Sequence, residues 1–260
     1  MPELPEVEYA ARQVRAAVVG RTVRNLKALH ASQRRRLSAR DCARVRGATI
    51  ESVDRHGKHQ LLRLSTGDVV VVHFRMTGDW LIDAASAPVP KFARVTLELD
   101  DGARVSLVDP RALSTVQVIS GEKAFLPRLG PDAADATVSV DTFGAALARR
   151  RVPIKVALLD QRVLAGVGNI YAVEALWVAK IDPRVVASSL THARQARLLD
   201  AIRAVLAKAS RSSGQYRDAD VGRFEVYDRE GEPCSRCSAG IRRITQAGRS
   251  TYYCPRCQRR

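Results

Sequence analysis

The sequence contains no long apolar run, and its first residues include no basic segment. The longest strongly apolar stretch covers only residues 69–73, whereas a membrane-spanning helix needs roughly 18 apolar residues. The first ten residues carry three glutamates and neither lysine nor arginine, so we do not expect a secretory signal. We therefore expect a cytoplasmic protein that has no membrane partner.

Cysteine is scarce, with five residues in 260, and without an export signal this argues against a disulfide framework. Cys42 stands alone, and we interpret it as a small apolar side chain. The other four form two C-x2-C pairs with sixteen residues between them: Cys234, Cys237, Cys254 and Cys257. Two such pairs complete a tetrahedral shell, which predicts one structural zinc ion with no open coordination position. Reduced thiols without a metal are the alternative.

Acidic residues are heavily outnumbered, with 27 Asp and Glu against 43 Lys and Arg, and the net charge is +16. This excess predicts a polyanionic partner, either a nucleic acid or an anionic membrane. Only seven of the basic residues are lysine, and an arginine-rich proteome would explain part of that bias. No basic amphipathic helix with a large apolar face stands out, which favours nucleic acid.

Short strands dominate the first half of the chain after an initial helix. Apolar residues recur every three or four positions in residues 3–19, which predicts a helix that stops at Gly20. Residues 94–99 and 103–108 alternate in polarity on either side of an Asp-Gly turn, as in a β-hairpin. Residues 69–74 read as a buried strand. This pattern predicts an N-terminal β-sandwich.

Helical periodicity takes over after the break at residues 130–131. We expect four helices, the last with Thr191 as its N-cap, over residues 141–150, 154–164, 170–179 and 191–210. Residues 241–253, between the cysteine pairs, predict a hairpin that turns at Ala247-Gly248. We therefore predict an α+β chain of three domains: a β-sandwich with flanking helices (1–130), a helical domain (131–215) and a β-hairpin zinc finger (216–260).

Two glycines precede the third predicted helix. Gly166 and Gly168 would let a turn bring backbone N–H groups to a phosphate, with the helix N-terminus facing the anion. We expect Asn169 to cap this helix and to donate to a phosphate oxygen. A structural turn between packed helices explains the same pattern. Arg249, at the tip of the predicted hairpin, would reach a DNA backbone or simply be solvated.

Six motifs, spread over nearly the whole chain, resemble those of the formamidopyrimidine-DNA glycosylase (Fpg/Nei) family. The resemblance implies a helix–two-turn–helix domain in the middle of the chain. It also implies a monomeric enzyme of base excision repair that acts on damaged double-stranded DNA. Such an enzyme would work at the bacterial nucleoid. Leu4 resembles the Fpg branch more than the Nei branch. The motifs are residues 2–6 (Pro-Glu-Leu-Pro-Glu), 56–58 (His-Gly-Lys), 73–78 (His-Phe-Arg-Met-Thr-Gly), 109–111 (Asp-Pro-Arg), 166–171 and the four-cysteine module.

The second residue supplies a nucleophile if Met1 is removed. Pro2 would then carry an N-terminal secondary amine. An α-amino group has a pKa of about 8, so part of it is unprotonated at neutral pH. Attack on C1′ of a deoxyribose gives an iminium ion that labilises the bonds β and δ to it. Glu3 is suited to proton transfer at the sugar oxygen. With Met1 retained, the Pro2 nitrogen is an amide, and Pro-Glu is then an ordinary helix start.

The resemblance assigns Pro2 and Glu3 these same roles and implies others. It adds Lys58 and Arg249 as catalytic residues and Glu6 as part of the lesion pocket. It also implies that three side chains fill the void left by a flipped base, namely Met76, Arg111 and Leu113. The DNA contacts that it implies are Lys58, His73, Arg111, Lys155, Asn169 and Arg249.

Two departures from the family pattern bear on the choice of lesion. Leu113 stands where relatives often carry phenylalanine, and residues 217–223 are shorter than the family's lesion-capping loop. We expect removal of oxidised purines, 8-oxoguanine and formamidopyrimidines, followed by β,δ-elimination. Oxidised pyrimidines or ring-opened alkylated purines are alternative substrates, and a non-catalytic binder of damaged DNA is an alternative function.

Overall fold

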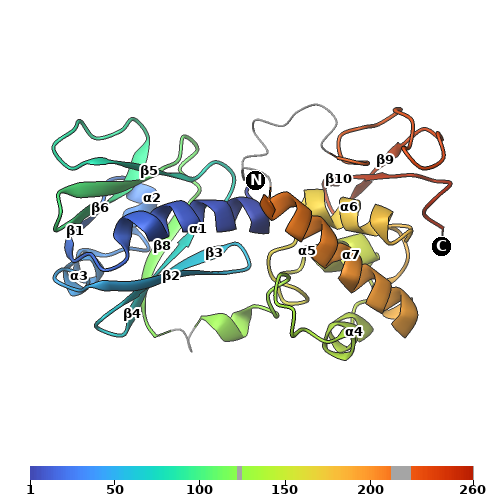
Figure 1. Ribbon diagram of the computed structural model, residues 1–260, viewed down its shortest axis with the longest axis horizontal. Coiled ribbons are helices and arrows are strands. Elements are labelled where there is room, and N and C mark those ends of the chain that lie inside the picture. Colours follow the sequence, from blue (N-terminus) through green and yellow to red (C-terminus); the bar gives the residue numbers. More distant parts are fainter. Residues whose placement is uncertain (122–124, 212–223, 260) are drawn as a thin grey trace. The chain divides into compact units, whose positions relative to one another are not determined.

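The computed structural model describes residues 1–121, 125–211 and 224–259 (Figure 1). The chain divides into two units. Residues Met1–Pro2 and Glu6–Pro127 form the first unit, and Glu3–Pro5 with Arg128–Arg260 form the second. The domain boundaries expected near residues 130 and 215 stay predictions, and residue 215 lies outside the described residues. The described part of the chain has no helix with the length and apolarity needed to cross a membrane.

Two four-stranded antiparallel sheets make up the first unit. Their strands are β1 (Val23–Ala28), β2 (Ile50–His56), β3 (His59–Leu64), β4 (Asp68–His73), β5 (Asp79–Ala84), β6 (Ala93–Leu99), β7 (Ala103–Val108) and β8 (Thr115–Ser120). The strand orders are β1-β6-β7-β5 and β2-β3-β4-β8. Buried apolar residues of both sheets belong to one cluster with Ala11, Val14 and Val18 of helix α1 (Leu4–Val18). The predicted sandwich is therefore confirmed, and so is the β6–β7 hairpin, where Gly102 adopts a φ of +82°.

Two short helices interrupt the region that the sequence predicts as strands. They are α2 (Ala31–Arg34) and α3 (Ala39–Arg44), between β1 and β2. A capping box starts α3: the Ser38 side chain accepts from the Asp41 N–H, and the Asp41 carboxylate accepts from the Ser38 N–H. Helices of four and six residues are too short to show an amphipathic period, which is why the pattern missed them.

In the described residues, four α-helices and two short 3-10 helices follow. They are η2 (Leu126–Arg128), α4 (Val140–Ala148), α5 (Ile154–Leu159), α6 (Asn169–Val178), η3 (Ala187–Ser189) and α7 (His192–Arg211). The Thr191 hydroxyl accepts from the Arg194 N–H at 3.4 Å, as expected of an N-cap. The prediction that α5 continues to residue 164 was wrong. It ends at Leu159, because Asp160 is extended and its carboxylate accepts from the Arg162 N–H at 3.0 Å.

The C-terminal hairpin consists of β9 (Arg242–Gln246) and β10 (Arg249–Tyr253). Ala247 and Gly248 both have positive φ, 47° and 70°, which is the geometry of a two-residue type I′ turn. The hairpin predicted with its turn at these residues is therefore confirmed. Buried Ile241 and Tyr252 belong to one apolar cluster with Val173 and Trp177 of α6. Helix α6 is buried over residues 170–177, as expected of a helix that is covered on all sides.

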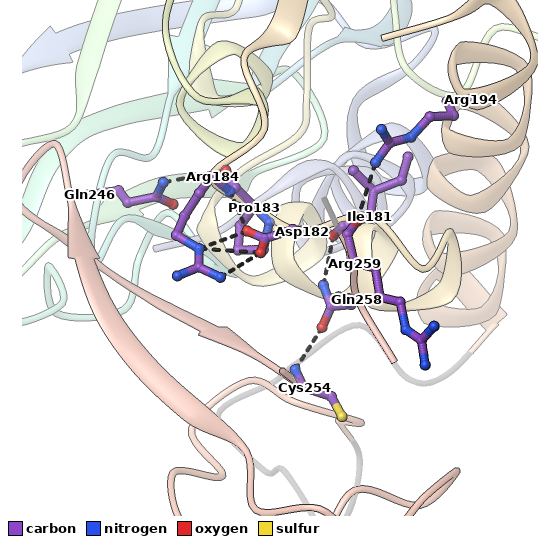
Figure 2. A network of polar contacts seen from close by, with 9 residues as sticks. All are labelled: Ile181, Asp182, Pro183, Arg184, Arg194, Gln246, Cys254, Gln258 and Arg259. Atoms are coloured by element: carbon purple, nitrogen blue, oxygen red, sulfur yellow. Dashed lines mark hydrogen bonds and ion pairs between the residues drawn. The ribbon is translucent and has the colours of Figure 1, made fainter. Parts of the chain in front are cut away.

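Gln258 joins the second cysteine pair to the loop that follows α6 (Figure 2). Its amide nitrogen donates to the Ile181 carbonyl at 2.9 Å, and its oxygen accepts from the Cys254 N–H at 2.7 Å. The Asp182 N–H donates to the Arg259 carbonyl at 3.3 Å beside it. Gln258 and Asp182 are both buried. The hairpin module is therefore tied to the helical part through buried polar contacts, which require a defined geometry.

Candidate active site

The Glu3 carboxylate lies at the N-terminus of α6. Its Oε2 accepts from the Gly168 N–H at 2.9 Å and from the Tyr171 N–H at 3.3 Å, and its Oε1 accepts from the Ile170 N–H at 2.8 Å. These are the donors that a helix leaves unsatisfied at its start, and the helix dipole favours a negative charge there. Glu3 is buried. The side chain is therefore fixed in position with its negative charge stabilised.

The two glycines of this turn are explained by what they touch. A Cβ at Gly168 would overlap the Glu3 carboxyl carbon. Gly166 has a φ of +110°, and a Cβ there would press on the Leu4 side chain, whose backbone N–H donates to the Gly166 carbonyl at 3.2 Å. The helix N-terminus expected to receive a phosphate therefore holds a carboxylate of the chain itself.

Asn169 does not cap α6 as the sequence predicted. The N-cap is Gly168, which has no side chain to accept a hydrogen bond, and Asn169 is the first residue of the helix. Its Nδ2 instead donates to the Ser250 carbonyl at 3.0 Å, next to Arg249 on β10. Its Oδ1 is buried and has no hydrogen-bond partner among the described residues. Asn169 thus fastens the hairpin to the start of α6.

Lys155 is a fully buried lysine on α5. Burial, together with the charge of Arg249, lowers its pKa to about 8, and the negative charge of Glu3 acts in the opposite direction. Its Nζ has no hydrogen-bond partner among the residues that the structure describes. Within the second unit the fold therefore gathers Glu3, Lys155, Asn169 and Arg249, four residues that come from separate parts of the sequence.

The four cysteines of the hairpin module have the geometry of a metal site. All four Sγ atoms lie within 4.8 Å of one another. The Sγ–Sγ distance is 3.4 Å for Cys237 and Cys254 and 4.0 Å for Cys234 and Cys257. Four sulfurs at about 2.3 Å from a tetrahedral zinc ion stand about 3.8 Å apart, so this donor set fits zinc. The Trp177 indole N–H donates to Cys234 Sγ at 3.4 Å and orients that ligand.

In the first unit, a buried carboxylate organises the loop that carries Arg111 and Leu113. Asp109 accepts from three backbone N–H groups, those of Arg111 at 3.1 Å and of Leu113 and Ser114 at 2.7 Å each. It also accepts from the Thr77 hydroxyl. Burial acts to raise the pKa of Asp109, but these hydrogen bonds outweigh burial and leave the pKa below its ordinary value.

Asp109 thereby connects the two loops that carry the predicted void-filling residues. Thr77 follows Met76, which is half-buried, whereas Arg111 and Leu113 are exposed. Sequence reasoning quoted Asp109 only as part of a motif and gave it no role. The role could have been predicted from the Asp-Pro pair at the end of a strand. Such a pair commonly starts a turn in which the Asp side chain accepts hydrogen bonds from the N–H groups that follow.

His73, at the end of β4, is a neutral histidine with a fixed tautomer. Burial, and then the charges of His59 and Arg75, lower the pKa of His73 to about 3. Its Nδ1 accepts from the Arg75 N–H at 2.9 Å, so in the neutral ring the proton is on Nε2. His59 packs edge-on against it with 4.6 Å between ring centroids. The Nε2–H group is thus the one available to donate to a ligand.

The remaining predicted residues lie in the first unit or outside the described residues. Pro2 and Glu6 are buried, the latter in the first turn of α1, and Lys58 is buried in the turn between β2 and β3. Cys42 is partly buried against the sandwich core, as expected of a small apolar side chain. The shortened loop at residues 217–223 lies outside the described residues.

Three family models match consecutive parts of the chain. The formamidopyrimidine-DNA glycosylase N-terminal domain matches residues 1–116, and the H2TH domain of the same family matches residues 129–218. The zinc finger found in FPG and IleRS matches residues 231–260. This last match agrees with the geometry of the cysteines, which hold one structural zinc ion.

Whole-chain comparisons agree with these matches. A formamidopyrimidine-DNA glycosylase of Rhizorhabdus wittichii is 40% identical over 100% of both chains. A crystal structure of Lactococcus lactis Fpg with DNA that contains an abasic site matches with a TM-score of 0.89 at 30% identity, over 99% of this chain and 100% of that one. The same values hold for Lactococcus lactis Fpg with DNA that contains FAPY-dG. The chain therefore belongs to the formamidopyrimidine-DNA glycosylase family and is a DNA glycosylase of DNA repair.

Proposed function

We propose that this chain, as a monomer, excises oxidised purines from duplex DNA and then cuts the abasic strand by β,δ-elimination. The purines are formamidopyrimidines and 8-oxoguanine. The observation that carries the proposal is the Glu3 carboxylate, held by three N–H groups and joined directly to Pro2 in the chain. The related Lactococcus lactis structures with FAPY-dG and abasic DNA support both halves of the proposed reaction.

The first step is nucleophilic attack by Pro2 after removal of Met1. The unprotonated fraction of its amine forms a bond to C1′ while the bond from C1′ to the base breaks, and the base leaves with a proton. The sugar ring then opens, O4′ takes a proton, and the secondary amine becomes a positively charged iminium. Glu3 serves this step by moving the proton at the sugar oxygen and by stabilising the positive charge.

Strand cleavage follows from the iminium. Its positive charge draws electrons from C2′, which loses a proton, and the 3′ phosphate leaves by β-elimination. A second proton loss expels the 5′ phosphate by δ-elimination, and water then frees Pro2. Within the second unit, Lys155, Asn169 and Arg249 are the proposed DNA contacts, and the charges of both Glu3 and Arg249 act on Lys155.

The first unit contributes the residues that hold the DNA open. Extrusion of a base costs a few kcal/mol, and the vacated space must be filled. We assign Met76, Arg111 and Leu113 to this space, and the rigid loops around Asp109 support that role. We assign Lys58 and the Nε2–H group of His73 to contacts with phosphates, and Glu6 to the lesion pocket.

Cleavage of a panel of duplexes, each with one defined lesion, tests the proposal. We expect cutting at formamidopyrimidine and 8-oxoguanine sites, with phosphates at both new ends. Pro2→Gly should strongly depress cutting and leave DNA binding largely intact. Preferred cutting at oxidised pyrimidines would show that these, and not oxidised purines, are the substrates. Leu113 and the short segment at 217–223 depart from the family pattern and would explain such a preference. Equal cleavage by Pro2→Gly would show that the secondary amine of Pro2 is not required for the reaction.

A further inference from the structure

Helices α2 and α3 and the residues next to them carry uncompensated positive charge. Six arginines occur within residues 34–46, and all six are exposed. Asp41 is the only acidic residue of that segment, and the capping box of α3 engages it. Arg44 is neutralised by Asp68, with 2.5 Å between Nη2 and Oδ1. The other five, here called the arginine cluster, are Arg34, Arg35, Arg36, Arg40 and Arg46.

The arginine cluster borders a basic hollow. A cavity of about 400 Å³ opens between β1 and the two helices. Lys27, Arg34 and Arg46 line it, and the described residues put no carboxylate on its wall. Arg34 is held in place because its guanidinium donates to the Ala28 and Leu29 carbonyls at 3.3 Å each. A concave surface with several cations and no acid is complementary to an anion.

Several other arginines of the first unit form ion pairs with carboxylates. Arg104 forms an ion pair with Asp83 at 2.6 Å, and Arg55 forms one with Glu8 at 3.1 Å. Like charges crowded on one surface repel one another and destabilise the folded state unless an anionic partner neutralises them. The five arginines of the cluster, for which the described residues provide no ion pair, are therefore suited to a polyanion.

Helix α2 is rigidly joined to the loop that carries the proposed void-filling residues. The Gln33 side chain is completely buried, and its Nε2 donates to the Ser114 carbonyl at 2.6 Å. Ser114 in turn donates its N–H to Asp109. The run Arg34–Arg36 therefore begins one residue after a side chain that is fixed to the Arg111–Leu113 loop. A duplex that this loop enters would pass close to that run.

We propose that the arginine cluster is a second contact for the phosphate backbone of the same duplex, on nucleotides that flank the extruded one. The proposal rests on the proposed function, since it takes damaged duplex DNA as the ligand. Arginine guanidinium groups bind phosphate oxygens without reading the base sequence. The contact would thus strengthen binding to any duplex that extends far enough beyond the lesion to reach it.

The salt dependence of DNA binding tests this proposal. The probe is a 30-base-pair duplex with a tetrahydrofuran abasic-site analogue, and the variant is Arg35→Gln/Arg36→Gln/Arg46→Gln. Each phosphate contact contributes about 0.9 to the slope of log Kd against log salt concentration. We expect the variant to lower that slope by roughly 1 to 3. A duplex cut back to a few base pairs on each side of the lesion should show a smaller difference.

The matched control is Arg128→Gln/Arg149→Gln/Arg151→Gln, which removes the same charge from exposed positions elsewhere in the chain. Its slope should equal that of the wild type. Equal slopes for the cluster variant and the control variant would overturn the proposal. Single-turnover cleavage at saturating enzyme separates the two proposals. If the wild type binds but does not cleave, the proposed reaction fails, while the comparison of slopes still decides the role of the arginine cluster.

Discussion

The Gly168 backbone N–H donates to the Glu3 carboxylate at 2.9 Å, across 165 positions of sequence, and the glycine leaves just enough space for that carboxylate. This relationship joins the first residues of the chain to the start of α6. It explains why the turn before α6 needs a residue without a Cβ. It also fixes the residue that follows the proposed nucleophile.

Gly168→Ala should therefore impair catalysis more than binding. The added methyl group must displace the Glu3 carboxylate from its three donors. Removal of one oriented donor from an active site commonly costs about 10²-fold to 10³-fold in rate, and we expect a loss of at least that size in single-turnover cleavage. Affinity for an abasic-analogue duplex should change by less than about threefold. Gly240→Ala is the control, because its Cβ would meet only one atom, at 3.6 Å. Full activity in Gly168→Ala would contradict the role given to Glu3.

Asp109→Asn should loosen the loop of Arg111 and Leu113. The amide keeps the shape of the side chain but loses the charge that three N–H groups share. We expect a loss of about 1–3 kcal/mol in the free energy of unfolding. Base excision should slow more than cleavage of a preformed abasic site, because only excision requires a base to be held out of the duplex. Asp101→Asn, in the exposed β6–β7 turn, is the control. An equal slowing of both reactions would argue against a role in extrusion.

Acid should destabilise the fold through two partly buried histidines. Burial lowers the pKa of His73 to about 3 and that of His59 to about 4, from an ordinary value of 6.5. Below pH 6.5 the unfolded chain therefore takes up protons that the folded chain does not, so the free energy of unfolding falls as the pH is lowered. We expect about 1 kcal/mol per pH unit from each histidine between pH 6 and 4.5. Urea unfolding at several pH values measures this slope.

Two variants test whether these histidines cause the dependence of unfolding free energy on pH. His73→Gln and His59→Gln should each flatten the dependence of unfolding free energy on pH. An unchanged slope in His73→Gln would mean that this ring already carries a proton in the folded state. Its Nδ1 would then lose the hydrogen bond from the Arg75 N–H in that pH range.

Loss of zinc should destabilise the contacts between the hairpin and the helical part as well as the hairpin itself. Cys254→Ser removes one of four ligands, and the Cys254 N–H also anchors Gln258 against the Ile181 carbonyl. We expect loss of bound zinc by metal analysis, a lower unfolding temperature and at least about tenfold weaker DNA binding, because folding energy and metal binding are linked. Cys42→Ser should retain zinc and affinity. Undiminished affinity in the zinc-free variant would show that the hairpin does not contribute to binding.

Local patterns in the sequence were sufficient to predict strand β4, the β6–β7 hairpin, the C-terminal hairpin, the main helices and the metal site. Polarity alternation around Asp101-Gly102 and the spacing of the cysteine pairs depend on residues close in sequence, so they can be recognised before the fold is known. The hydrogen bond between Gly168 and Glu3 could not be predicted, because the two residues are far apart in sequence. The pattern of Gly166 and Gly168 predicted a phosphate at the helix N-terminus, but the structure has the Glu3 carboxylate of the same protein there.

The role of Asp109 escaped prediction for a related reason. Its hydrogen bonds to Leu113 and Ser114 are local, but the one from Thr77 links two loops that only the β-sandwich brings together. Gln33 is a similar case, because α2 is too short to be predicted and its partner Ser114 lies 81 positions away. Polar contacts of this kind become visible only when the tertiary structure is known.

The most direct test of the mechanism locates the covalent bond. Borohydride should trap the wild-type enzyme on a duplex with an abasic site, and tandem mass spectrometry of the adduct should place the sugar on the Pro2 nitrogen of a chain that lacks Met1. A sugar attached to Lys155 or another amine, or active enzyme that still carries Met1, would contradict the account.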